Sequence, residues 1–172
     1  MAGGSKSKNK GNGAERELCA LLSGFLGGSF TRVPNSGAMT GGKNAWRMGV
    51  LSETQGRIYK GDIIPPDHLP KLVLESKFYA DFRFHQLMQP GPVPQLDTWI
   101  GQAKEAIVEG DFWMVCFKIN LRGWYVALAQ EFEQEFEFGN HCRYTGAHGR
   151  FVVTDLKDFF SLNSDSVTRL SK

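Results

Sequence analysis

One apolar run constrains the fold more than any other part of the chain, and it covers residues 71–79 (KLVLESKFY). Leu, Val and aromatic residues dominate the run, and Pro70 marks where a strand can begin, so it predicts a β-strand. Side chains alternate along a strand, which places Glu75 and Lys77 on one face together with Val73. A carboxylate and an ammonium group therefore emerge side by side from a strand that is apolar enough to be core.

A second short apolar run precedes this strand. It covers residues 61–64 (GDII) and is followed by two prolines. If the two runs pair through the connection 66–70, Asp62 approaches Glu75, and two carboxylates beside a lysine suit metal-assisted phosphodiester hydrolysis. Taken alone, Glu-x-Lys is more typical of a strand edge stabilised by a salt bridge than of a metal site.

Composition narrows the class of protein. The chain has 172 residues, of which 41% are hydrophobic and 22% charged, as in an ordinary globular domain. The net charge of +2 does not by itself argue for nucleic acid, although basic residues are concentrated before the first acidic strand. The three cysteines are widely spaced, which favours free thiols in a reducing compartment over a disulfide framework. The sequence contains no apolar leader and no run long enough to span a bilayer, so we expect a cytoplasmic protein.

The N-terminal part divides at Gly13. Residues 1–12 are rich in Gly, Ser, Lys and Asn, which predicts a flexible arm, either simply solvated or contacting phosphates. From Gly13 onward, apolar residues recur at helical spacing until a Gly-Gly pair ends the pattern. Glu15 lies beside the apolar stripe and leans toward the body of the protein, while Arg16 points away. The helix dipole alone also favours acids at this end.

A long loop follows the next predicted strand, residues 29–33. The loop covers about residues 36–60 and is rich in glycine and basic residues, and long irregular loops in compact domains are usually functional or disordered. Lys43 and Arg47 flank Trp46, a combination suited to phosphate contact with one stacking surface. The alternative is a loop whose tryptophan packs back onto the core.

The remaining elements complete one predicted domain, residues 13–172. We expect a helix over 96–107, a strand over 112–119 with a hairpin partner over 124–129, an edge strand over 150–154 and a short helix over 155–162. Strands mixed with helices around one sheet place the chain in the α/β or α+β class.

The order of these features resembles the PD-(D/E)xK nuclease superfamily, and within it the archaeal-type Holliday-junction resolvases and their phage-encoded relatives. The strings that carry the resemblance are Lys10-Gly11 before Glu15-Arg16-Glu17-Leu18, Arg32 before Ser36-Gly37, residues 61–64, residues 74–77, and Phe117-Lys118 before Gly123-Trp124-Tyr125. They cover residues 10–129. The chain departs from the compact archaeal enzymes by a longer insertion between Ser36 and Asp62, and by its extension past Ala129.

The resemblance implies a restriction-endonuclease-like core, a central mixed β-sheet flanked by helices. It also implies a Mg²⁺-dependent endodeoxyribonuclease, with Mn²⁺ able to substitute, that acts on four-way or other branched DNA in recombination or repair. Asp62, Glu75 and the backbone carbonyl of Ser76 would hold the metal, with Glu15 joining directly or through water. Lys77 would position the attacking water or neutralise charge in the transition state.

Further expectations concern DNA contacts and assembly. The residues expected to contact DNA are Lys10, Arg16, Arg32, Ser36, Lys43 and Arg47. A homodimer is expected because a junction has near two-fold symmetry and resolution needs paired cuts, and an exposed Phe159-Phe160 patch would serve as its interface. The alternatives are a nickase or restriction-like endonuclease on other DNA, or a non-catalytic nucleic-acid-binding module. The expected location is the cytoplasm of a bacterium or of a phage-infected host.

Overall fold

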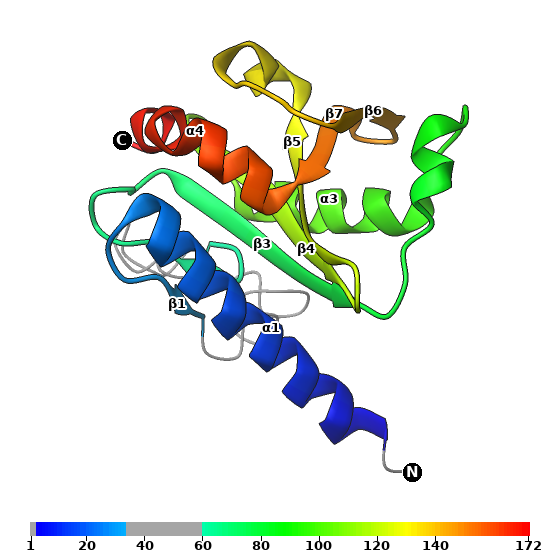
Figure 1. Ribbon diagram of the computed structural model, residues 1–172, viewed down its shortest axis with the longest axis horizontal. Coiled ribbons are helices and arrows are strands. Elements are labelled where there is room, and N and C mark those ends of the chain that lie inside the picture. The colour runs from blue at the N-terminus through cyan, green and yellow to red at the C-terminus, as the bar shows by residue number, and fades with distance from the viewer. Residues whose placement is uncertain (1–2, 34–59) are drawn as a thin grey trace.

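A mixed β-sheet forms the centre of the protein (Figure 1). The computed structural model describes residues 3–33 and 60–172, with side chains from residue 11 onward. In chain order, these parts contain α1 (Gly3–Leu26), β1 (Thr31–Arg32), β2 (Ile63–Ile64), β3 (Leu72–Tyr79), η3 (Phe84–Met88), α3 (Pro94–Ala106), β4 (Phe112–Ile119), β5 (Gly123–Ala129), η4 (Gln130–Glu135), β6 (His141–Gly146), β7 (Gly149–Asp155) and α4 (Leu156–Leu170). The strands form one sheet in the order β1-β2-β3-β4-β5-β7-β6. This α+β fold, compatible with a restriction-endonuclease-like core, confirms the predicted class.

The two central strands, β3 and β4, run parallel, whereas the other pairs of the described sheet are antiparallel. Their register joins Leu72 to Phe112 at one end and Tyr79 to Ile119 at the other. Parallel neighbours need a crossover connection, and α3 provides it. β4 and β5 form the predicted hairpin, with Ile119 opposite Gly123. The carboxyl end of β3 therefore lies beside the turn after β4, at the same end of the strands (Figure 1).

Helices cover both faces of the sheet, and the alternation along β3 shows which helix lies on which face. Leu72 and Leu74 pack in one buried cluster with side chains of α1 and α4. Val73 packs in a second cluster, on the opposite face, with side chains of α3. Since Glu75 and Lys77 alternate in the same phase as Val73, they project to the face that carries α3.

The first helix begins earlier than its apolar pattern predicts. The pattern starts at Gly13, but the backbone of α1 is helical from Gly3, so the predicted flexible arm begins the helix instead. The added residues include lysines, which favour a helix, but also Gly, Ser and Asn, which do not. No proline interrupts them, so the helix extends into them from its packed half rather than through their own propensity. No helix in residues 3–33 or 60–172 is long and apolar enough to cross a membrane.

The C-terminal strands differ from the prediction in one respect. The strand predicted at the sheet edge over residues 150–154 is β7, and it lies inside the sheet between β5 and β6. The true edge strand, β6, escapes prediction because Tyr144 is its only buried side chain. A strand with so little burial has no apolar alternation to detect.

The last helix is longer than predicted and its phenylalanines are core residues. α4 extends to Leu170, and the Asp155 side chain caps its first turn by accepting two backbone N–H groups. Phe159 and Phe160 are 1% and 0% exposed and belong to the cluster beneath α1 and α4. The predicted exposed Phe159-Phe160 patch is therefore wrong, because these side chains face the sheet rather than solvent.

Candidate active site

The carboxylates of Asp62 and Glu75 come together where β2 pairs with β3. Ile63 lies opposite Leu74 in antiparallel register, so the preceding residue Asp62 falls opposite Glu75. Residues directly opposite each other in antiparallel strands project to the same face. The backbone N–H of Asp62 donates to the carbonyl of Leu74 at 2.9 Å. The short proline-bounded connection between the two runs thus brings the two acids together, as its length predicts.

Two further contacts fix this arrangement. The Lys77 Nζ atom lies 2.6 Å from Glu75 Oε1. The backbone N–H of Ser76 donates to Asp62 Oδ2 at 3.0 Å. Because the N–H and C=O of one residue point to the same side of a strand, the Ser76 carbonyl also faces the side on which Asp62 lies. Two carboxylates, one ammonium group and one backbone carbonyl are therefore gathered at the edge of β3 that faces β2.

Burial gives this pair of acids an unusual charge state. Glu75 is only 8% exposed. Burial raises the pKa of Glu75 from 4.5 to about 7, the negative charge of Asp62 adds to the rise, and the opposing effect of Lys77 does not offset them. Near neutral pH, Glu75 therefore holds less than its full negative charge, because burial and the neighbouring Asp62 disfavour its ionised form.

The chemistry of these groups fits a divalent cation. Carboxylate and carbonyl oxygens are the hard ligands that Mg²⁺ prefers, and it commonly takes only one or two carboxylates from a protein and keeps several waters. Within residues 11–33 and 60–172, no group of three or more His, Cys, Asp or Glu side chains is placed to hold a metal. A second positive charge beside Asp62 and Glu75 would also remove their mutual repulsion.

Glu15 is not brought to this pair. α1 packs on the sheet through Leu18, on the face opposite to the one that carries Glu75. The Glu15 carboxylate instead accepts from Arg32 Nε at 2.7 Å, and Asn12 accepts from the same guanidinium at 2.8 Å. Helical periodicity predicted correctly that Glu15 leans toward the body of the protein, but it could not say which face of the sheet the helix covers.

The residues expected to contact DNA have different surroundings. Arg16 is exposed on α1, as predicted. Arg32 is half-buried and already paired with Glu15. Lys10 lies in α1, but its side chain is outside the described part of the structure. Three others, Ser36, Lys43 and Arg47, lie outside the described residues together with the loop 36–59.

A second polar cluster, which the sequence did not single out, lies on the α1 face. The Glu17 carboxylate accepts from Lys118 Nζ and, at 2.9 Å, from Trp124 Nε1. Burial acts to raise the pKa of Glu17, but the hydrogen bonds from Lys118 and Trp124 outweigh it and the pKa is lowered. This cluster ties the first helix to the β4–β5 hairpin. The only sequence signal for this cluster was the string Phe117-Lys118 before Gly123-Trp124-Tyr125, which contains two of its residue types.

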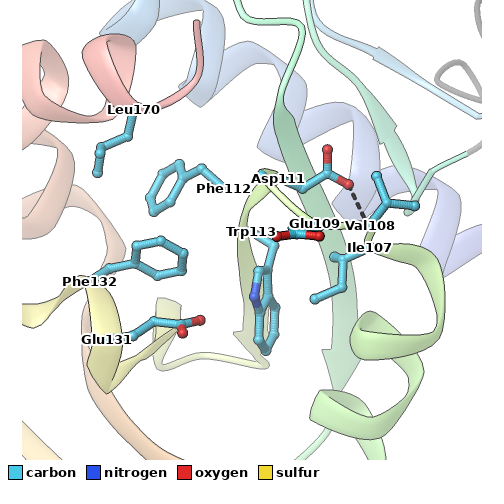
Figure 2. A pocket seen from close by; sticks show the side chains of 10 residues that line it. Ile107, Val108, Glu109, Asp111, Phe112, Trp113, Glu131, Phe132 and Leu170 are labelled. Carbon is cyan, nitrogen blue, oxygen red and sulfur yellow. Dashed lines mark hydrogen bonds between the residues drawn. The ribbon is translucent and has the colours of Figure 1, made fainter.

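A hollow of about 610 Å³ lies at the other end of β4 (Figure 2). Phe112, Trp113 and Phe132 are among its apolar lining residues, and Glu109, Asp111 and Glu131 are its acidic ones (Figure 2). None of the gathered residues at the edge of β3 lines it. Its acidic lining residues would repel phosphates, so the hollow does not extend the candidate site.

Comparison with known proteins decides the family. Residues 6–167 match a family model described as "Phage putative PDDEXK endonuclease". The chain belongs to this family. No curated protein and no solved structure matches the chain. Membership in the PD-(D/E)xK endonuclease family supports a nuclease, with DNA as its substrate, and members of this superfamily generally use divalent metals.

Gly61 gives a first prediction. Its backbone has φ +69°, and a Cβ atom there would clash with the carbonyl oxygen of Leu74. Because both strain and clash would fall on the residue directly before Asp62, we expect Gly61→Ala to lower the free energy of unfolding by about 2 kcal/mol. Urea denaturation measures this. Gly24→Ala on α1 is the control, since a Cβ at Gly24 meets nothing within 4 Å. Equal stability of the two variants would contradict the prediction.

Proposed function

We propose that this PD-(D/E)xK endonuclease is a Mg²⁺-dependent enzyme that cuts branched DNA, with Mn²⁺ able to replace Mg²⁺. The observation that carries the proposal is the gathering of Asp62, Glu75 and Lys77 on one face at the edge of β3. The resemblance to the resolvases supports branched DNA, and the family match supports the nuclease class.

Each residue has a proposed role that follows from its chemistry. Asp62, Glu75 and the Ser76 carbonyl would hold the cation, and the hydrogen bond from the Ser76 N–H keeps the Asp62 carboxylate in place. A divalent cation supplies Lewis acidity, which makes water a better nucleophile and offsets negative charge on the phosphate. Lys77, freed from Glu75 once that carboxylate has a metal partner, would orient the attacking water or stabilise charge on the phosphoryl oxygens.

Glu15 has a different proposed role. Its ion pair with Arg32 holds the guanidinium group in place. Arg32 lies on β1, which pairs with β2, and β2 begins directly after Asp62. Arg32 would then contact a DNA phosphate on the α1 side of the sheet, with Glu15 and Asn12 holding it in position. Glu15 as a metal ligand, direct or through water, stays a prediction that this geometry does not support.

A homodimer is part of the proposal because paired cuts across a two-fold symmetric junction need two copies of one site. Burial of Phe159 and Phe160 removes the surface first expected for it. Sedimentation with and without junction DNA tests the assembly. A monomer in both conditions would favour a nickase that cuts one strand at a time.

The substrate is tested by incubating the protein with a labelled four-way junction and with a linear duplex of identical sequence, each with Mg²⁺ or with EDTA. Cutting of the junction in preference to the duplex, only with Mg²⁺, is the expected result. Equal cutting of both DNAs would favour a restriction-like endonuclease. Binding of both without cutting, in either Mg²⁺ or Mn²⁺, would overturn the proposal in favour of a non-catalytic module.

A further inference from the structure

The turn between β4 and β5 carries a side chain that the fold does not use. Leu121 is 96% exposed at the tip of this turn. The N–H of Arg122 donates to the carbonyl of Ile119 at 3.0 Å, and the N–H of Asn120 donates to the carbonyl of Tyr79, also at 3.0 Å. The turn is therefore tight, and it is tied by its backbone to the last residue of β3.

The backbone at this tip also disfavours leucine. Leu121 has φ +61° and is the only non-glycine residue with positive φ in residues 3–33 and 60–172. Positions with positive φ in tight turns favour Gly or Asn, and a bulky side chain there is strained. Neither burial nor local conformation accounts for a leucine at this position. Residues that break local rules without a benefit to the fold are expected at functional sites.

A second exposed apolar side chain stands beside the turn. Tyr79 is 43% exposed and ends β3 on the same face as Glu75 and Lys77. It lies two residues beyond Lys77, about 7 Å along the strand. Its ring is 4.9 Å from that of the buried Trp99, which in turn packs against Phe117 at 5.2 Å. The Tyr79 ring is thus supported from behind by buried aromatic side chains and partly open to solvent.

The charge around the β4–β5 turn and the end of β3 suits DNA. Arg122 is exposed in the turn itself, and Arg83 is exposed just before η3. Neither forms an ion pair with any described residue. Phe84, adjacent to Arg83, packs against Tyr125 of the hairpin at 4.5 Å, which places Arg83 near the same turn. Free guanidinium groups supply phosphate contacts and let apolar side chains approach a nucleic acid.

We propose that Tyr79 and Leu121 form a base-contacting wedge that recognises an interruption in the DNA helix next to the cut. Bases in a continuous duplex are stacked and closed to such side chains, whereas a base at a branch, gap or bulge offers a free face. Tyr79 stacks on that face and Leu121 fills the space left by the missing neighbour. The inference rests on the proposed function, because it assumes that DNA lies across the edge of β3.

The test compares affinities for three DNAs of one sequence in EDTA: a continuous duplex, a duplex with a short gap, and a four-way junction. A 2-aminopurine base at the interruption reports stacking through its fluorescence. We expect Leu121→Asn and Tyr79→Ala each to lose about tenfold in affinity for the two interrupted DNAs, with losses under about twofold on the duplex. Tyr79→Phe should keep wild-type affinity because it keeps the ring.

Stability separates a binding role from a structural one. Asn suits positive φ better than Leu, so Leu121→Asn should unfold at the same temperature as the wild type or higher. The control, Leu162→Asn, removes an exposed leucine from α4 and should leave all three affinities unchanged. A fall in the unfolding temperature of Leu121→Asn would show that the fold uses its side chain. That result would overturn the role of Leu121, while the Tyr79 variants would decide the role of the ring.

The remaining outcomes also decide the inference. Equal losses on interrupted and continuous DNA, or no loss at all, would overturn the wedge. Failure of the wild-type protein to cut any DNA with Mg²⁺ would overturn the proposed function instead. The affinity comparison is made without metal and without cleavage, so the two failures are distinguishable.

Discussion

Replacing Asp62 with Asn, or Glu75 with Gln, should reduce DNA cleavage by more than about 100-fold in Mg²⁺ while leaving DNA binding intact. Each change removes one of the two carboxylates gathered at the edge of β3 and retains nearly the same shape. Binding should be preserved or slightly strengthened, because a negative charge near the phosphates is lost. Cleavage rates and affinities for one labelled junction measure both effects.

The matched control is Asp67→Asn. Asp67 is an exposed acid in the connection between β2 and β3, so it tests whether loss of any nearby carboxylate has the same effect. This variant should cut at the wild-type rate. Wild-type cleavage by Asp62→Asn or Glu75→Gln would rule out the proposed metal site. Cleavage that falls only together with the thermal unfolding temperature would assign Asp62 and Glu75 to stability alone.

Glu75→Gln should also stabilise the metal-free protein at alkaline pH. The pKa of Glu75 is about 7 in the folded protein against 4.5 ordinarily, so as pH rises from 4.5 to 7 the unfolded chain loses this proton first. Wild-type stability therefore falls across this window, and the full cost, at most about 3 kcal/mol, is present above pH 7. The Gln side chain does not ionise in this pH range, so the variant avoids this cost.

Denaturation in EDTA at pH 4 and pH 8 measures the difference between wild type and Glu75→Gln. The variant should match the wild type at pH 4 and exceed it at pH 8, and added Mg²⁺ should stabilise only the wild type. Glu105→Gln, an exposed acid on α3, serves as the control and should show no pH-dependent difference. A larger gain in stability at pH 4 than at pH 8 would have the wrong sign for a buried carboxyl group with a raised pKa, and would contradict the prediction.

The gathering of Asp62 and Glu75 was predictable because it depends on short-range rules. Residue types and period-2 alternation identified β3, Pro70 marked where it begins, and a short connection to β2 leaves few ways for the two runs to pair. The β4–β5 hairpin followed in the same way from two apolar runs around a short turn.

Other features depend on long-range packing and could not be predicted from pattern. The stripe on α1 shows that Glu15 leans toward the sheet, but only the packing of Leu18 shows on which face. The start of α1 and the edge strand β6 have no apolar periodicity to mark them. The exposure of Leu121 likewise follows from the turn geometry rather than from its residue type.

The parallel pairing of β3 with β4 has a consequence for synthesis of the enzyme. Asp62, Glu75 and Lys77 all leave the ribosome before α3 and β4, yet β3 has no parallel partner until β4 has been translated. A nascent chain that ends before α3 lacks both the crossover helix that packs on β3 and the parallel partner strand, and long-range parallel pairing is intrinsically slow. Nuclease competence should therefore arise only after most of the polypeptide has been made.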